Sequence, residues 1–190
     1  MASPFEASFA EAGRLLDSFR SDQGALQKLD LVADWLTEAL RSGHKALACG
    51  NGGSMADAMH FAEEWTGKFR AERDPYPVLA LSDPTHMSCT ANDFGFDEVF
   101  ARGVRAFGGP GDLLFVLSTS GNSTNLVRAV EAAKDKGVRT IGFLGKGGGK
   151  LAGMCDLVVM APGSTSDRIQ ELHMLALHTL IEVVEQRLVG

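Results

Sequence analysis

The stretch at residues 49–64, CGNGGSMADAMHFAEE, combines two features that can do chemistry. Its turn, Asn51-Gly52-Gly53-Ser54, joins a short apolar run to a predicted helix. Glycines allow positive φ and close backbone approach, and the free amides of a helix's first turn favour an anion, so we expect a phosphate or carboxylate at Ser54. Further along the helix, His60 and Glu64 are four residues apart and share one face, which makes them a candidate metal or acid/base pair.

A second loop, Ser118-Thr119-Ser120-Gly121-Asn122-Ser123, repeats this arrangement. An apolar strand runs into a hydroxyl-rich turn with one glycine, and a predicted helix follows from Thr124. The hydroxyl donors match the oxygens of a phosphate monoester. Helix capping by Ser120, Asn122 or Ser123 is the alternative explanation. One cap needs only one of these residues, so the loop favours phosphate binding.

The last predicted helix carries two further candidates, Gln170 and His178. They are eight residues apart, about 80° around a helix, so both can face one site and complete it with His60 and Glu64. The alternatives stay open. A helical His–Glu pair is frequent on surfaces, Gln170 can close a capping box with Asp167 as the N-cap, and His178 can be a core histidine bonded to a carbonyl. His173 has the same two interpretations as His178.

Three other polar positions are ambiguous on the sequence alone. Asp93 follows Asn92 in a predicted turn, where turn chemistry explains the pair as well as ligand contact does. Lys68 and Arg168 can reach a phosphate, although a solvated surface charge is the simpler interpretation of each.

The elements that must position these residues alternate between strand and helix. Leu113 to Val116 is an apolar run without alternation, which indicates a strand covered on both faces. The pattern predicts a doubly wound α/β fold with a parallel sheet of about five strands, whose ligand crevice lies outside the carboxyl ends of the strands. Both loops should therefore lie at the same edge. The predicted strands are 45–49, 78–81, 112–117, 139–144 and 157–160. The predicted helices are 5–19, 25–42, 85–91, 97–107, 124–136 and 167–188, with a further helix that starts at Ser54 and includes Glu64.

Length and composition predict one soluble domain over residues 1–190. Hydrophobic residues make up 45% and charged residues 22% of the chain, as in ordinary globular proteins. The N-terminal helices, about 4–42, should pack on the core or on a partner subunit, and the last helix is apolar around most of its circumference, which indicates a subunit interface.

Charge, apolar runs and cysteines exclude several classes of protein. A net charge of −6 gives no reason to expect nucleic acid as a partner. The longest apolar run, 172–184, is interrupted by charged and histidine side chains, so we expect no membrane span, and we expect a cytoplasmic location because no secretory signal is apparent. Cys49, Cys89 and Cys155 form no CxxC pair and are expected to be buried free thiols.

With these motifs assembled, the sequence resembles the phosphoheptose isomerases, the sedoheptulose 7-phosphate isomerase branch of the sugar isomerase (SIS) domain proteins. The resemblance covers nearly the whole chain. The serine loop alone is typical of SIS sugar-phosphate binding, whereas HFAEE together with RIQE and a later His178 is more specific. The motifs are CGNGGS from Cys49, DAMHFAEE from Asp57, NDFGF from Asn92, STSGNS from Ser118 and DRIQELH from Asp167.

The resemblance implies a three-layer αβα SIS domain, a homotetramer, and one zinc ion per subunit bound by His60, Glu64, Gln170 and His178. It also implies a place in the biosynthesis of heptose precursors for surface polysaccharide, such as lipopolysaccharide. Lys68 departs from the family, where we expect arginine; lysine keeps the charge but loses bidentate geometry. The expected sugar-phosphate contacts are Asn51, Gly52, Gly53, Ser54, Glu64, Asn92, Asp93, Ser118, Thr119, Ser120, Ser123 and Gln170.

The reaction implied is the aldose–ketose isomerisation of sedoheptulose 7-phosphate to D-glycero-D-manno-heptose 7-phosphate through an enediol. Such a reaction needs a base, an acid and stabilisation of an oxyanion, and we assign Glu64 as the base and His178 as the acid. The alternative is a non-catalytic SIS protein that binds a sugar phosphate or a protein partner, as relatives that bind the replication initiator do. That alternative leaves Glu64, Gln170 and His178 together without a purpose.

Overall fold

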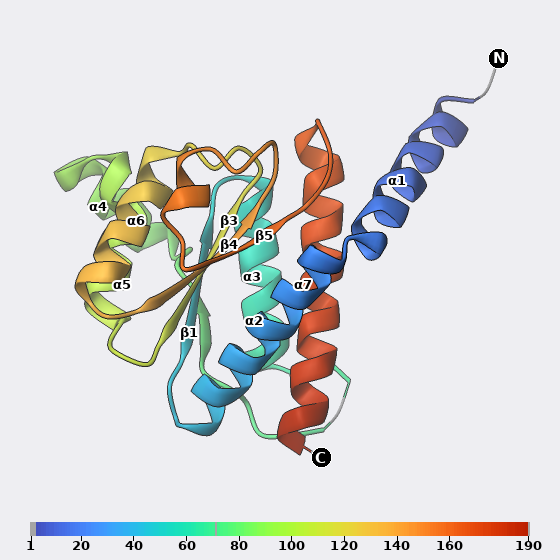
Figure 1. Cartoon of the computed structure of the whole chain (residues 1–190). Helices are drawn as coiled ribbons and strands as arrows, with labels where there is room; N and C mark the ends of the chain where they lie inside the picture. Colours follow the sequence, from blue (N-terminus) through green and yellow to red (C-terminus); the bar gives the residue numbers. More distant parts are fainter. Residues whose placement is uncertain (1–2, 71, 190) are drawn as a thin grey trace.

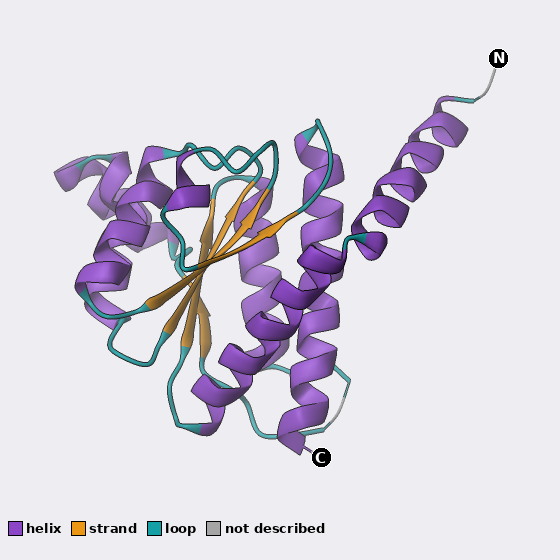
Figure 2. Ribbon diagram, in the orientation of Figure 1, coloured by secondary structure: helices purple, strands orange, loops and turns teal. Residues whose placement is uncertain are grey.

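Five parallel strands in the order β2-β1-β3-β4-β5 form the central sheet (Figure 2). The computed structural model describes residues 3–70 and 72–189. The strands are β1 (Ala46–Gly50), β2 (Val78–Ala80), β3 (Leu113–Ser118), β4 (Arg139–Leu144) and β5 (Leu157–Met160). The helices are α1 (Pro4–Ser21), α2 (Gln23–Arg41), α3 (Gly53–Thr66), α4 (Pro84–Phe94), α5 (Val99–Phe107), α6 (Thr124–Asp135) and α7 (Ser166–Val189), with 3-10 turns η1 (Phe96–Glu98) and η2 (Lys150–Gly153).

Helices cover both faces of the sheet, which confirms the doubly wound α/β prediction. All six residues of β3 are buried, because its side chains alternate between two cores. Phe115 and Leu117 pack with α2, α3 and α7, whereas Leu114 and Val116 pack with α5 and α6. Figure 1 shows these two helix layers on opposite sides of the sheet.

The switch point of the sheet lies between β1 and β3. The two strands pair in parallel from Ala46 and Leu113 to Gly50 and Leu117, and β2 lies on the other side of β1. Their carboxyl ends therefore meet at one edge, and the loops that follow them leave the sheet side by side, as predicted. In such folds ligands bind at this crevice.

The N-terminal helices differ in how they pack. Val32 and Leu36 of α2 are fully buried in the core that α2 shares with α7. In contrast, α1 extends beyond the rest of the molecule (Figure 1), and the side chains of Phe5 and Phe9 are 74% and 72% exposed. None of the helices in residues 3–70 and 72–189 has the length and apolar composition that crossing a membrane needs.

Two local predictions are wrong. The helix predicted to end at Ala91 continues to Phe94, so Asn92 and Asp93 are helical and not in a turn. The helix ends only at Gly95, whose φ of 89° suits glycine and whose N–H donates to the carbonyl of Ala91. Cys89 lies on the outer face of this helix and is exposed, whereas Cys49 is buried as expected.

Candidate active site

The N-termini of α3 and α6 both point at the switch point without a capping side chain. Gly52, with φ of 57°, is the N-cap of α3 and has no side chain that could cap the helix. Ser123 is the N-cap of α6, and its hydroxyl makes no capping hydrogen bond among the described residues. The capping alternative for Ser123 is therefore wrong. Two uncapped helix N-termini at one edge form a site suited to an anion, and we call the two loops that precede them, residues 51–54 and 118–123, the anion cradle.

The side chains of the second loop divide into those that shape it and those that face outward. The buried Ser118 hydroxyl accepts a hydrogen bond from the Gly121 amide at 3.0 Å, and the Asn122 side chain donates to the Ser120 carbonyl at 3.0 Å. These contacts hold the turn closed. Thr119, Ser120 and Ser123 are only partly buried and can donate to a phosphate.

Asn125, which the sequence interpretation missed, joins this loop to the first one. Its side-chain amide exchanges two hydrogen bonds with that of Asn51, at 2.8 and 3.0 Å. Asn125 is only 2% exposed. In the sequence, Asn125 could have been noticed as a polar residue on the otherwise apolar face of α6. The amide of Asn51 therefore holds the two loops together.

The sequence interpretation also missed a cation, Lys146, near the second loop. Lys146, in the loop after β4, donates from Nζ to the Ser166 hydroxyl at 3.4 Å, and that hydroxyl contacts the Thr119 hydroxyl at 3.0 Å. Lys146 thus brings positive charge to the edge where a phosphate would lie.

The two cations proposed from the sequence have different surroundings. Lys68 is exposed, as expected of a solvated charge. Arg168 is only 13% exposed in its side chain, and it pairs with Asp167 and Glu171 and donates to the carbonyl of Ser8. The interpretation of Arg168 as a solvated surface charge is therefore wrong, because its guanidinium anchors α1 to the start of α7.

His60, Glu64 and His178 form one cluster between α3 and α7. Their ligand atoms lie within 4.8 Å of one another. The Nε2 atom of His60 is 3.3 Å from Oε1 of Glu64, and the rings of His60 and His178 meet edge to face with centroids 4.9 Å apart. Two imidazole nitrogens and one carboxylate oxygen are a donor set of catalytic zinc sites, so these residues fit a zinc ion.

The fourth predicted ligand, Gln170, contacts the turn before α3. Its Nε2 donates to the Ser54 hydroxyl at 3.4 Å, and a Cβ on Gly53 would lie 2.6 Å from the Gln170 amide nitrogen, so a larger residue there would displace the Gln170 side chain. The capping box is wrong, because α7 begins at Ser166 and its first turn is closed by a bond from Ile169 N–H to the Thr165 carbonyl. In this structure Gln170 packs against the anion cradle, about two turns of α7 before His178.

Of the two ambiguous histidines, His173 is the core histidine. It is 1% exposed, its Nε2 lies 3.2 Å from the carbonyl oxygen of Leu144, and burial lowers its pKa to about 4. His178, by contrast, is partly exposed and lies in the cluster.

Asp57 is a third acidic group on the cluster's helix, one turn before His60. Its Oδ2 atom is buried and has no hydrogen-bond partner within the described part of the chain. Burial raises its pKa to about 6, against the opposing effect of His60. The sequence signal for it was its spacing of three residues from His60.

Asn92 and Asp93 lie apart from this cluster, on α4. Asn92 donates to Asp93 at 2.7 Å, Cys89 donates to the other Asp93 oxygen at 3.6 Å, and these side chains line an open hollow on the outer face of α4. The structure does not bring this pair into contact with the loops or the histidines.

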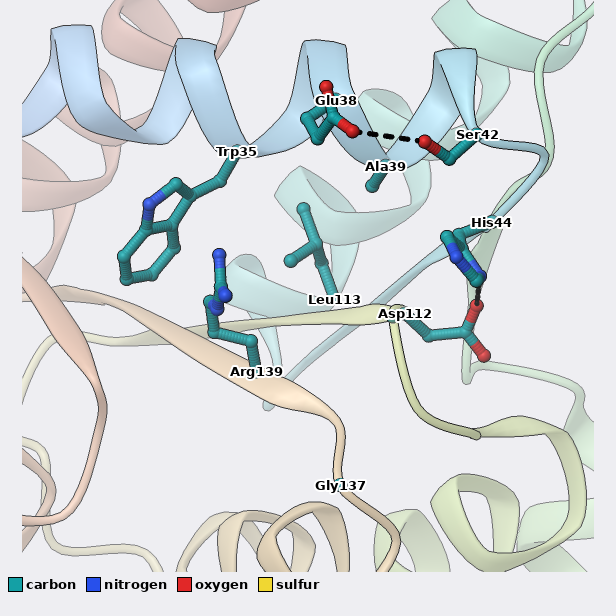
Figure 3. A pocket seen from close by; sticks show the side chains of 10 residues that line it. Trp35, Glu38, Ala39, Ser42, His44, Asp112, Leu113, Gly137 and Arg139 are labelled. Carbon is teal, nitrogen blue, oxygen red and sulfur yellow. Dashed lines mark hydrogen bonds and ion pairs between the residues drawn. The ribbon is translucent and has the colours of Figure 1, made fainter.

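A separate cavity of about 230 Å³ lies at the opposite edge of the sheet, beside the amino ends of β3 and β4 (Figure 3). Its polar and charged side chains already have partners among the residues of the cavity wall. Glu38 accepts from the Ser42 hydroxyl at 3.1 Å, and the Arg139 guanidinium lies 4.5 Å from the centre of the Trp35 ring. The loops and histidines described above are therefore the better candidate.

The fold and the anion cradle define a class of α/β protein suited to bind an anionic ligand at the switch point of its sheet. The sequence profile of the SIS domain family matches residues 9–145, and the chain belongs to that family. Within it, the chain belongs to the phosphoheptose isomerases, a family of isomerase enzymes.

Relatives named phosphoheptose isomerase support this assignment. The protein from Fusobacterium nucleatum is 49% identical over 95% of this chain and 93% of its own length, and that from Vibrio cholerae is 48% identical over 96% of each chain. The solved structure of phosphoheptose isomerase from Neisseria gonorrhoeae has a TM-score of 0.90, is 37% identical, and covers 96% of this chain and 97% of that one.

Proposed function

We propose that the protein interconverts sedoheptulose 7-phosphate and D-glycero-D-manno-heptose 7-phosphate. The observation that carries the proposal is that one helix, α3, has the anion cradle at its N-terminus and His60 and Glu64 further along it. Ser54 and His60 are separated by about 9 Å of helix rise. An extended seven-carbon sugar phosphate is of comparable length, so its phosphate can lie at the cradle while the C1–C2 end reaches the cluster.

In the forward direction, Glu64 removes a proton from C1 of the ketose to form the enediol and returns that proton to C2. His178 donates a proton to the C2 oxygen as the enediol forms, and it takes a proton back from the C1 hydroxyl as Glu64 protonates C2 and the aldehyde forms. Asn51 and the hydroxyls of Thr119, Ser120 and Ser123 hold the phosphate and sugar chain, because they lie at the two helix N-termini.

His60, Glu64 and His178 would hold a zinc ion, with Gln170 as the proposed fourth ligand. When bound, zinc supplies positive charge that stabilises the oxyanion of the enediol. A carboxylate that binds zinc would be a weaker base, so the two roles proposed for Glu64 compete.

We propose that the protein is a cytoplasmic homotetramer of single SIS domains. Its product would be a heptose precursor for the synthesis of lipopolysaccharide. The exposed Phe5 and Phe9 on the projecting α1 support docking on a second copy. Contact between Asn92 and Asp93 and the sugar also requires such an assembly, because in one subunit they lie on α4 away from the cluster.

The direct test is incubation of the purified protein with sedoheptulose 7-phosphate, with product detected by NMR. The wild type should form the heptose phosphate, Glu64→Gln and His178→Gln should lose turnover, and Glu131→Gln, an exposed carboxylate on α6, should keep it. Absence of product with the wild type would overturn the isomerase and favour the non-catalytic sugar-phosphate-binding alternative. Elemental analysis of protein purified without chelator tests the zinc assignment, and full activity without stoichiometric metal would contradict it.

A further inference from the structure

The segment that follows α3 runs along α7 and contacts one face of it at three successive positions. We call residues 67–70 and 72–73 the strap. The α7 residues that it contacts are spaced four and three residues apart, so they line up along one face of the helix. The contacts pair Phe69 with His178, Arg70 with Glu182, and Arg73 with Glu185.

The ring of Phe69 fixes one face of the His178 imidazole. The two rings are stacked, with centroids 5.8 Å apart and planes 23° apart. The ring of His60 approaches the same imidazole edge-on at 4.9 Å. A side chain that is packed on two sides has few alternative rotamers, so the orientation of His178 depends on Phe69.

Arg73 joins the end of α3 to α7. Its Nη2 donates to the carbonyl of Glu64 and its Nη1 to the carbonyl of Trp65, both at 2.9 Å. These are carbonyls of the last helical turn, which have no partner within the helix. Its Nε donates to Glu185 at 2.8 Å, and both side chains are at most 5% exposed. The buried pair therefore connects the turn that carries Glu64 to the helix that carries His178.

We propose that Phe69 and Arg73, with Glu185 as the anchor of Arg73, are positioning residues that hold His178 against His60 and Glu64. The inference rests on the proposed function, in which these three side chains meet the C1–C2 end of the sugar. A misplacement of about 1 Å can lower a rate by about a hundredfold. The anion cradle lies at the other end of α3, away from the strap. Loss of the strap contacts therefore lowers kcat and leaves KM, which depends on the cradle, nearly unchanged.

The first variant is Phe69→Leu, which keeps an apolar side chain and removes the stacked ring. We expect kcat to fall by at least about tenfold and KM to change by less than about twofold. The ¹⁵N resonances of the His178 side chain should shift, and affinity for Co²⁺, titrated by visible absorbance, should fall. Phe107→Leu, an exposed aromatic on α5, is the matched control and should match the wild type.

The second variant is the double substitution Arg73→Met/Glu185→Leu. Replacing both members of a buried ion pair with apolar residues is often neutral for stability, whereas removing one member is strongly destabilising. The double variant should therefore stay folded, with a lowered Tm because the Glu64 carbonyl and the Arg70 N–H also lose their partners. It should show the lowered kcat and Co²⁺ affinity of Phe69→Leu. Arg73→Lys, which keeps the charge beside Glu185, should restore part of kcat.

The outcomes separate this proposal from the proposed function. If the wild type does not isomerise the sugar phosphate, the function fails, and the His178 resonances and Co²⁺ affinity still test the strap. If the wild type is active and both variants keep its kcat, Co²⁺ affinity and His178 resonances, the strap proposal is overturned. A loss of activity that only follows the loss of folded protein would also overturn it.

Discussion

Asn51 and Asn125 exchange two side-chain hydrogen bonds across the switch point, at 2.8 and 3.0 Å. Asn51 follows β1 and Asn125 lies in the first turn of α6, so this pair fixes the distance between the two loops of the anion cradle. Asn125 is 2% exposed, and the loss of its partner would leave a buried amide unpaired.

Asn51→Ala and Asn125→Ala should each lower the free energy of unfolding by about 1–3 kcal/mol. The double variant should lose less than the sum, because each single change already breaks the pair. Urea denaturation measures the stability, and KM for the sugar phosphate should rise in all three variants. Gln27→Ala, an exposed amide on α2, is the control. Strict additivity of the two single changes would contradict a direct interaction.

Lys146→Met should raise KM for the sugar phosphate by about threefold. This corresponds to the loss of roughly 0.6 kcal/mol of attraction between one exposed charge and the phosphate. Methionine keeps the length of the side chain and removes the charge beside Ser166. The effect should shrink as salt is added, since exposed charges are screened. Lys136→Met, at the other edge of the sheet, should leave KM unchanged; an equal rise in both variants would indicate a general effect of net charge.

Removal of metal should lower Tm, and zinc should restore it. A ligand present at 100 times its Kd stabilises the folded state by about 2.7 kcal/mol. Differential scanning calorimetry of chelator-treated protein, with and without zinc, measures this response. His60→Ala and His178→Ala should abolish it, and His44→Ala, at the amino edge of the sheet, should retain it. A full zinc response in the first two variants would exclude the cluster as the metal site.

His173 should make stability depend on pH between about 6.5 and about 4. Burial lowers its pKa from 6.5 to about 4, so the unfolded chain binds a proton in this range before the folded protein does. The contribution of neutral His173 to the free energy of unfolding is therefore fully present above pH 6.5 and is lost as the pH falls toward about 4. At 1.36 kcal/mol per pKa unit, the total loss is about 3 kcal/mol.

The His173→Met variant isolates this effect. Asp57 acts in the opposite direction, because its raised pKa of about 6 makes the folded state gain a proton, and stability, as pH falls from about 6 to 3.8. The difference in unfolding free energy between wild type and His173→Met should therefore be followed from pH 7 to 4.5 by urea denaturation. The variant should lose less stability than the wild type, and parallel curves would contradict the assignment.

Phe5→Ser/Phe9→Ser should reduce the assembly to smaller species at micromolar concentration. Both side chains are more than 70% exposed in one subunit, and burying them against a partner is favourable in proportion to the apolar area removed from water. Size-exclusion chromatography with light scattering measures the mass. Leu79→Ser/Phe107→Ser, exposed apolar residues elsewhere, is the control. An unchanged mass would remove α1 from the interface.

The order of the elements and the shared edge of the two loops were predictable from the sequence. Apolar periodicity reports which residues are covered, and parallel strands connected by helices place all their following loops at one edge. For that reason the strands of the sheet, α6 and α7 begin and end within about two residues of the predictions, and α3 begins within one. The end of α4 was not predictable, because the Gly95 cap outweighed the turn preference of Asn92 and Asp93.

Residue types and spacing by themselves predicted the anion cradle, the His60–Glu64 pair and the candidates on α7. Only the tertiary structure decided which α7 side chains meet α3: His178 joins the pair, His173 lies in the core, and Gln170 contacts Ser54. The tertiary structure was also needed to recognise the contacts of Asn125, Lys146 and the strap. The physical reason is that spacing along a helix fixes which residues share a face, whereas the partner of that face depends on how distant elements pack.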